Sequence, residues 1–318
     1  MAVTIKPGWS KPSTILFASE IPVNEKAFGF ALSEAAEFNA NLILFHVYDN
    51  PEAASSFSFG PRRDDYSQAR AEKHLLEPFA ERARNLGIHC RVVVRPGSPA
   101  EQILIFLDGR KIDRVVMGAH SPGPIGKLLV GSVAEAVLRN ACVPVNIVGP
   151  YVVEGAYRNS PSRTILCSAG TRESSRVVVS FAAELAARHR ASLILQHVIE
   201  PQESANVLAG RSLGQMEDEL FSLIPSRFHD RVNVRTRAVL GDPTEELLYQ
   251  GRSQHANFIV MGAHGASKFA AATRAGIVYK VLAYAQCPVI TLSPTVLTEC
   301  GATQHQPRLS ESSMAGVF

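Results

Sequence analysis

The sequence contains two copies of one unit, and this internal repeat constrains the fold more than any other feature. Residues 97–145 align with residues 241–289 without a gap, and 14 of the 49 positions are identical, where average composition would give roughly three. GSPAEQIL matches GDPTEELL, VVMGAH matches IVMGAH, and AVLRNACVPV matches KVLAYAQCPV. At slightly larger offsets, TILFAS from Thr14 matches TILCSA from Thr164, and NLILFHV from Asn41 matches SLILQHV from Ser192. A period of about 145 residues is too long for a solenoid, so each copy is expected to be a domain with its own core.

The repeat divides the chain into a first domain of residues 1–150, a second domain of residues 151–297 and a flexible tail of residues 298–318. The connecting stretch, residues 149–162, has no sustained apolar period and carries Gly, Pro, Asn and Ser, as a connector does. The tail is polar and has no counterpart in the first copy, which predicts mobility. With 46% hydrophobic and 19% charged residues, the remainder of the chain is expected to fold.

Within each copy, short apolar runs alternate with longer amphipathic runs, which predicts strands alternating with helices. In the first copy the predicted strands are Thr14–Ser19, Leu42–Val47, Arg91–Arg95, Arg114–Met117 and Val145–Val148. The predicted helices are Glu25–Phe38, Asp65–Leu86, Pro99–Leu107 and Val133–Asn140. Because the strands are almost entirely apolar, both of their faces are expected to be buried, as in a parallel sheet covered by helices. Each copy is therefore predicted to be a five-stranded α/β domain with helices on both faces of the sheet.

The third helix of each copy has a clear predicted start. Gly97-Ser98-Pro99 in the first copy corresponds to Gly241-Asp242-Pro243 in the second. Ser and Asp are good N-cap residues, and proline at the first helical position loses no hydrogen bond. Ser98 and Asp242 are therefore predicted to cap these helices.

Composition and charge exclude several classes of function. The net charge is +3 and there is no Lys/Arg cluster with interleaved aromatic residues, so no nucleic-acid partner is predicted. The apolar runs fall far short of the about 20 residues that span a bilayer, and the start MAVTIKPGWSK has no signal-peptide apolar region; both predict a cytoplasmic protein without membrane contact. Five cysteines without a C-x-x-C pair are expected to be reduced, and no metal-ligand spacing is present, so no metal site is predicted.

Ligands of parallel α/β sheets bind at the carboxyl ends of the strands. Two segments reach that edge in the first copy: Ala18-Ser19-Glu20 after the first strand, and MGAHSPGPIGKLLVGSVAEAVL from Met117 after the fourth. A glycine at a strand end and a Gly-Ser pair opening a helix present backbone N–H groups and a positive dipole end, which favours phosphate.

This segment does not match the P-loop motif, because Ser121 stands in the first glycine position and Leu128 in the last position. The dinucleotide fingerprint is missing after the first strand, which removes the main support for nicotinamide and flavin cofactors.

These motifs together resemble the universal stress protein family in its tandem form. The resemblance rests on V-M-G-A-H after strand four, a helix opening at Gly-Ser and C-V-P-V into strand five, and it covers residues 13–148 and 163–292. It implies the strand order 3-2-1-4-5 in each domain. It also implies an internal pseudo-dimer in which the edge strands Val145–Val148 and Val289–Leu292 pair. In nucleotide-binding members the phosphate motif is G-x-x-G, nine residues, then G-[S/T], and an acid closes strand one.

Carried onto the first copy, the phosphate motif falls on Gly118, Ser121, Gly131 and Ser132, with Glu20 in the place of the acid. Ser121 departs from the family's glycine, and Glu20 carries its carboxylate one methylene further out. The resemblance implies that the first domain binds ATP or AMP, with Mg²⁺ accompanying a triphosphate. The implied binding residues are Ala18, Ser19, Glu20, Val47, Met117, Gly118, His120, Ser121, Gly131, Ser132 and Val133.

Carried onto the second copy, the motif keeps Gly262 and Gly265, but its distal pair has become Ala275-Gly276. Gly170 stands where the acid should be, so the hydroxyl and the carboxylate are both lost. The second domain is therefore expected to be degenerate for nucleotide binding, with at most one nucleotide per chain.

Several candidate residues have a structural alternative. Ser132 and Glu135 also form a capping-box pattern that would begin the helix without a ligand. His120 and His264 beside strand-end glycines favour a structural hydrogen bond over catalysis, and His46 and His197 are expected to be packed. Lys127 could meet a phosphate tail or be a solvated loop lysine. Gly210 to Gly214 spells the hydrolase elbow G-x-S-x-G but has no apolar strand leading into it.

Three functions are compatible with these features. The favoured one is a stress-response regulatory protein that binds an adenine nucleotide. The second is a stress scaffold without a nucleotide, acting through protein partners whose identity the sequence does not give. The third is a weak ATPase or adenylyl-transfer enzyme, for which no catalytic residue is assigned. Association of two such chains into a homodimer is compatible with all three.

Overall fold

The structure is a computed structural model that describes residues 5–48, 63–119, 131–155, 163–170, 175–201, 210–263 and 276–297. The strands of the first half are β1 (Thr14–Ser19), β2 (Asn41–Tyr48), β3 (Cys90–Pro96), β4 (Arg114–Gly118) and β5 (Val145–Val148). Its helices are α1 (Pro7–Ser10), α2 (Glu25–Phe38), α4 (Arg63–Asn85), α5 (Pro99–Leu107) and α6 (Ser132–Asn140). The strands of the second half are β6 (Thr164–Ser168), β7 (Ser192–Ile199), β8 (Val234–Leu240), β9 (Phe258–Gly262) and β10 (Val289–Leu292). Its helices are α7 (Ser175–His189), α9 (Leu213–Ser222), the 3₁₀ turn η1 (Ser226–Phe228), α10 (Pro243–Ser253) and α12 (Ile277–Tyr284).

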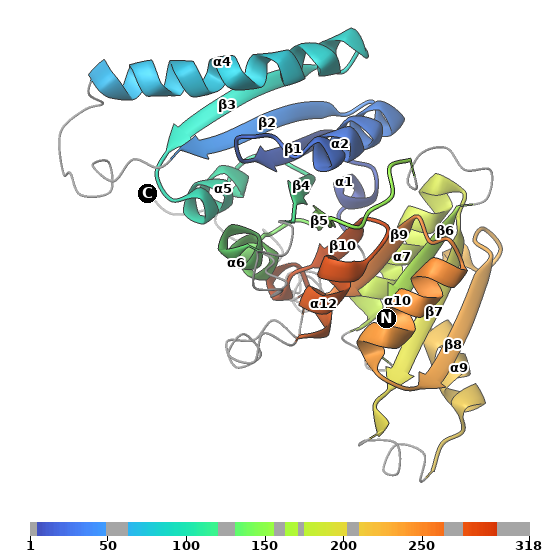
Figure 1. Cartoon of the computed structure of the whole chain (residues 1–318). Coiled ribbons are helices and arrows are strands. Elements are labelled where there is room, and N and C mark those ends of the chain that lie inside the picture. The colour runs from blue at the N-terminus through green and yellow to red at the C-terminus, as the bar shows by residue number, and fades with distance from the viewer. Residues whose placement is uncertain are drawn as a thin grey trace, which may run out of the picture.

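All ten of these strands form one sheet in the order β3-β2-β1-β4-β5-β10-β9-β6-β7-β8. Each half contributes the order 3-2-1-4-5 with parallel pairing, which confirms that prediction. The two halves meet at β5 and β10, which pair antiparallel with Val289 opposite Ile147 and Thr291 opposite Val145. Figure 1 shows these two strands at the centre of the molecule, with one half on each side. The predicted pairing of the edge strands is confirmed, and it removes two exposed apolar edges.

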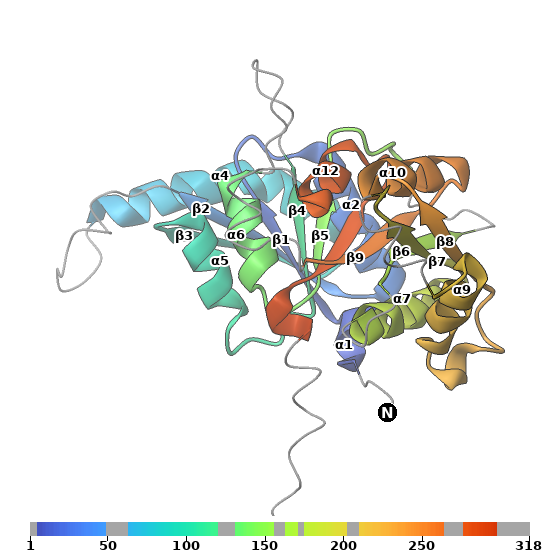
Figure 2. The ribbon, with the colours of Figure 1, turned by 90° about the horizontal axis from the view of Figure 1, so that it is seen from below.

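Helices cover both faces of the continuous sheet, as Figure 2 shows from a second side. One apolar cluster gathers side chains of α2 and α7, for example Phe28 and Phe181, and the other gathers side chains of α6 and α12, for example Val137 and Val281. Each cluster contains residues from both copies. The two copies therefore share their apolar cores across the β5–β10 junction, whereas the sequence predicted a separate core for each.

The predicted elements of the first half agree with the structure to within a few residues at each end. Helix α1 was not predicted. It has four residues, with Pro7 at its start and Trp9 buried to 2% exposure. A single turn is too short to show a 3.6-residue period, so periodicity gives no signal for it.

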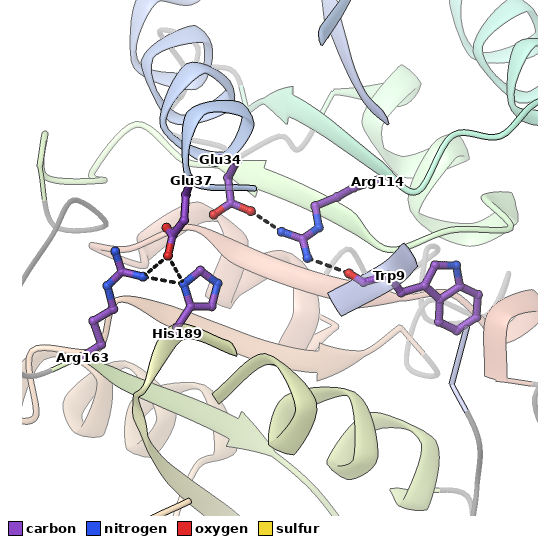
Figure 3. Close-up of polar contacts among 6 residues, drawn as sticks. All are labelled: Trp9, Glu34, Glu37, Arg114, Arg163 and His189. Atoms are coloured by element: carbon purple, nitrogen blue, oxygen red, sulfur yellow. Dashed lines mark hydrogen bonds and ion pairs between the residues drawn. The ribbon is translucent and has the colours of Figure 1, made fainter. Parts of the chain in front are cut away.

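A polar cluster lies across the junction of the two halves (Figure 3). Arg114 is fully buried, forms an ion pair with Glu34 of α2, and donates to the carbonyl oxygen of Trp9 at 2.6 Å. Glu37, also on α2, contacts two groups of the second half: Arg163 at 2.5 Å and Nδ1 of His189 at 2.9 Å. The α2 helix of the first half is thus held against the second half by charge as well as by apolar contact.

The described part of the chain contains no helix long and apolar enough to cross a membrane. Four cysteines lie in that part, and none of them forms a disulfide: Cys90, Cys142, Cys167 and Cys287. Burial raises the pKa of Cys90 to about 11 and that of Cys287 to about 12. These two thiols are therefore protonated and unreactive at neutral pH.

Candidate functional site

A cleft of about 210 Å³ opens at the carboxyl ends of β1 and β4, where the chain connections of the first half change direction. Nine of the eleven predicted binding residues line this cleft: Ala18, Ser19, Glu20, Val47, Met117, Gly118, Gly131, Ser132 and Val133. The other two, His120 and Ser121, lie outside the described residues, as does Lys127. The structure therefore brings together in one place the described parts of the two segments that the sequence singled out.

Apolar side chains form the floor of the cleft. Phe45 of β2 is 1% exposed and packs on Phe106 with ring centroids 4.6 Å apart. Ile103 of α5 and Met117 of β4 complete this surface. An apolar floor of this kind suits the face of an aromatic ring system.

The N-terminus of α6 faces the same cleft. Gly131 is its N-cap, and Ser132 is the first helical residue. The N–H groups of the first turn of a helix have no partner within the helix and lie at its positive end, which favours an anion.

The alternative interpretation of Ser132 and Glu135 as a capping box is wrong. Ser132 lies one residue inside the helix, so its hydroxyl does not cap the helix. Glu135 pairs with Arg139 one turn later, at 2.7 Å. The Ser132 side chain has no hydrogen-bond partner among the described residues, which leaves its hydroxyl available to a ligand.

Position 118 must be glycine because the Asn24 side chain lies close to it, a contact that the sequence did not indicate. A Cβ atom at this position would lie 2.6 Å from Nδ2 and 2.9 Å from Cγ of Asn24. The Oδ1 atom of Asn24 accepts a hydrogen bond from the N–H of Ala27 at 3.0 Å and so caps α2. Asn24 also lines the cleft. The glycine therefore lets the cap of α2 and the end of β4 meet at the carboxyl edge of the sheet.

The cleft is also lined by the polar residues Ser19, Glu20 and His46. Nδ1 of His46 lies 2.8 Å from the carbonyl oxygen of Ser19, and its Nε2 lies 3.7 Å from Glu72. His46 is 7% exposed, which confirms the expected packing, yet it also lines the cleft, which was not predicted. The parallel register pairs Ser19 with His46. His46 therefore reaches the cleft because the ends of β1 and β2 are neighbours in the sheet.

The same edge of the second half lacks the corresponding polar groups among the described residues. Gly170 stands in the place of Glu20, and its N–H donates to Oγ of Ser175 at 3.0 Å. Gly276 stands in the place of Ser132 and is the N-cap of α12. His264, Gly265 and Ala275 lie outside the described residues.

Two other candidate sites have structural explanations. Ser212 of the G-x-S-x-G sequence is the N-cap of α9 in a full capping box with Gln215, so it is not at a strand-to-helix elbow. Glu34, Glu37 and His189 bring three potential metal ligands within 4.8 Å of one another. Because Arg114 and Arg163 already pair with the two carboxylates (Figure 3), the cluster has no net negative charge to attract a cation.

Comparisons with known proteins all give the same family. The model of the universal stress protein family matches the chain twice, over residues 13–149 and 161–293. A universal stress protein of Methanocaldococcus jannaschii is 30% identical over 131 residues, which are 40% of this chain and 75% of that protein. One from Mycolicibacterium smegmatis is 24% identical over 292 residues, which are 85% of this chain and 93% of that protein.

Solved structures show the same fold. The crystal structure of a universal stress protein from Archaeoglobus fulgidus superposes with a TM-score of 0.66 at 19% identity. The match covers 90% of this chain and 97% of that chain. The similarity therefore extends over both halves rather than over one repeat.

Proposed function

We propose that this chain, which belongs to the universal stress protein family, is a stress-response protein. In this proposal its first domain, residues 1–150, binds ATP or AMP. The observation that carries the proposal is the cleft, which is lined both by apolar side chains and by the N-terminus of a helix. A nucleotide needs both, because its base is apolar on its faces and its phosphates are anionic. In the second domain, residues 151–297, the described residues offer neither the hydroxyl nor the carboxylate at the matching positions.

Each group of the cleft has a role in this proposal. The base lies on Phe45 and Ile103, and the Glu20 carboxylate accepts hydrogen bonds from the ribose hydroxyls. The first-turn N–H groups of α6 and the Ser132 hydroxyl donate to phosphate oxygens. Mg²⁺ enters with ATP on the phosphate oxygens, since it keeps several of its waters and is held mainly by substrate phosphates.

The first test asks what the purified protein carries. Denaturing the protein and analysing the released small molecules should yield ATP or AMP in a ratio near one per chain. A protein that releases no nucleotide and binds none by calorimetric titration would instead act as a scaffold for protein partners. Release of ADP that accumulates with time would indicate hydrolysis.

The second test places the nucleotide. Gly131→Asp puts a carboxylate where the phosphates are proposed to bind, and at an N-cap position aspartate favours the helix, so folding should be retained. Gly276→Asp makes the same change at the N-cap of α12 and is the matched control. We expect the first variant to lose ATP binding in calorimetric titration and the control to keep it. Tight binding by Gly131→Asp, or loss in the control, would place the nucleotide elsewhere.

A further inference from the structure

A second cavity, of about 330 Å³, lies in the second half at the amino ends of the strands, the edge opposite to that of the cleft. Its lining includes Asn257, which precedes β9, and Cys287, which lies just before β10. It also includes the ends of α10 and α12, which pack side by side (Figure 2). Cavities of roughly 300–1,000 Å³ are the usual size for small-molecule sites.

The repeat shows why this cavity is open. Gly251 and Ala256 line it, and they align with Leu107 and Ile112 of the first half. Those two larger side chains are buried, at 3% and 5% exposure. A Cβ atom at Gly251 would lie 3.3 Å from Cδ1 of Ile259. The first half therefore places two large aliphatic side chains where the second half has only a hydrogen and a methyl group.

The cavity has apolar walls and a basic rim. Leu248, Ile259 and Ala285 contribute the walls, whereas Arg252 and His255 are exposed polar residues of the lining. Among the residues the structure describes, the guanidinium of Arg252 has no ion-pair partner and no Asp or Glu lines the cavity. Glu154 lies in the chain between two lining residues but is not one of them. The charge that the lining presents is positive.

His255 has a backbone conformation that histidine adopts rarely. Its φ of 48° is in the left-handed region. It directly follows the C-cap Gln254, and the N–H of Ala256 donates to the carbonyl oxygen of Gly251 at 2.9 Å. Glycine usually occupies this position at a helix end, because a side chain there costs free energy. Such strained residues gather at ligand sites, which gives the imidazole at this rim a reason beyond the fold.

The helix ends decide which anion fits. Both α10, which ends at Ser253, and α12, which ends at Tyr284, bring their carboxyl ends to the cavity. A helix carries a partial negative charge at that end. A doubly charged phosphate is therefore disfavoured relative to a singly charged carboxylate, which a guanidinium binds through two parallel hydrogen bonds.

We propose that this cavity binds a small monocarboxylate with a compact apolar body. The body lies against Leu248 and Ile259, Arg252 holds the carboxylate, and a ring nitrogen of His255 donates to it. The inference is independent of the nucleotide proposed for the first half, because it concerns the other half, the opposite edge of the sheet and a ligand without phosphate.

The test uses the full chain and four probes in calorimetric titration: benzoate, phenylacetate, hexanoate and octanoate. We expect at least one to bind, and its uncharged amide to bind at least tenfold more weakly, because it lacks the charge-assisted hydrogen bonds. Phenyl phosphate should bind more weakly than benzoate or phenylacetate. The proposal is overturned if none of the four binds, or if the amide binds as tightly as the acid.

Two variants place the probe. Arg252→Gln removes the charge at an exposed position and should weaken binding at least tenfold. Ala256→Ile copies the first half and should abolish binding by filling the cavity, with folding checked by the melting temperature. Arg188→Gln is the matched control, since Arg188 is also in the last turn of a helix but does not line the cavity. Binding that survives Arg252→Gln, or is lost equally in Arg188→Gln, would overturn the proposal.

His255→Gly separates a ligand role from a structural one. Glycine takes the left-handed conformation without a penalty, so this variant should raise the melting temperature of the ligand-free protein while weakening carboxylate binding. A lower melting temperature with unchanged affinity would show that the imidazole serves the fold, and would remove His255 from the site.

Discussion

The two halves share a backbone plan but fill one buried position in opposite ways. In the first half Arg114 of β4 is fully buried and pairs with Glu34 of α2. The repeat aligns Arg114 with Phe258 and Glu34 with Leu185, and both of these are also fully buried. The fold therefore does not need an ion pair at this position. The second copy has an apolar pair at this position. The first copy has an ion pair, whose arginine also donates to the Trp9 carbonyl oxygen.

The two halves also differ at the carboxyl edge of the sheet, where the first half again carries the polar side chains. The first half keeps a hydroxyl at Ser132 and a carboxylate at Glu20, and the second has glycine at both positions. Glycine at a helix start or strand end preserves the backbone path without a side chain. The comparison teaches that strand order and helix starts survive in both copies, while the polar groups proposed to contact a ligand diverge.

The largest effect is expected from breaking the buried ion pair. Arg114→Met leaves the Glu34 carboxylate buried without its cation, and we expect a loss of about 3–5 kcal/mol in the free energy of unfolding. Glu34→Leu alone should cost a similar amount. The double variant copies the apolar solution of the second half, so it should recover most of the loss, less the cost of an unpaired Trp9 carbonyl.

Urea unfolding of the two single variants and the double variant measures the coupling. Additive losses in the double variant would show that the first half depends on charge at this position. The comparison with Phe258 and Leu185 would then not hold.

The next effect concerns ligand affinity. Ser132→Ala should weaken ATP binding by roughly 1–3 kcal/mol, the scale of a hydrogen bond to a charged group. Since Ser132 does not cap α6, the free energy of unfolding should change little. Adding the hydroxyl in the second half with Gly276→Ser should not create ATP binding, because Gly170 still lacks the carboxylate. Calorimetric titration measures both, and unchanged affinity of Ser132→Ala would remove the hydroxyl from the phosphate site.

Apolar periodicity and the repeat predicted most element bounds, and the resemblance to the universal stress protein family implied the strand order and the edge pairing. Nine of the eleven residues that the resemblance implies for binding line one cleft of the structure. Asn24 and His46 were missed, since each reaches the cleft through a contact between elements distant in sequence: Asn24 against Gly118, and His46 beside Ser19. No local pattern in the sequence contains such contacts.

The ionic contact across the junction gives a pH-dependent effect. Burial alone would raise the pKa of Glu37, but hydrogen bonds and charge from His189 and Arg163 outweigh it and lower the pKa from 4.5 to about 2. Since the folded-state pKa is the lower one, this stabilisation is complete above about pH 4.5 and is lost as the pH falls toward 2. Glu37→Gln should therefore cost on the order of 1 kcal/mol at pH 7, because the carboxylate is partly exposed.

Glu25 supplies the control within one half. It pairs with Arg82 at 2.9 Å with both side chains at least half exposed, so Glu25→Gln should change stability by a few tenths of a kcal/mol at most. Urea unfolding between pH 7 and pH 3 compares the two variants. A stability difference between wild type and Glu37→Gln that stays constant with pH would show that Glu37 does not join the halves electrostatically.

The smallest effect on stability is expected at the N-caps of α5 and α10, which occupy equivalent positions in the two halves. Asp242 accepts hydrogen bonds from the N–H groups of Thr244 and Glu245 at 2.8 and 3.0 Å, which confirms it as the cap of α10. Ser98 occupies the N-cap position of α5, but its side chain makes no capping bond, so the prediction for Ser98 is wrong in that respect. Both helices begin with proline at the first helical position, which fixes the backbone without help from the cap.

The two alanine variants therefore separate the effect of the cap from that of the proline. Asp242→Ala should cost about 1 kcal/mol in the free energy of unfolding, and Ser98→Ala only a few tenths. Neither should alter ATP affinity, because Asp242 lies in the second half and Ser98 is not among the residues lining the cleft. Equal losses measured by urea unfolding would mean that the Ser98 hydroxyl caps α5 in solution. The two copies would then begin this helix in the same way, and would differ at the carboxyl edge of the sheet, at the buried position of Arg114 and at the cavity beside Gly251.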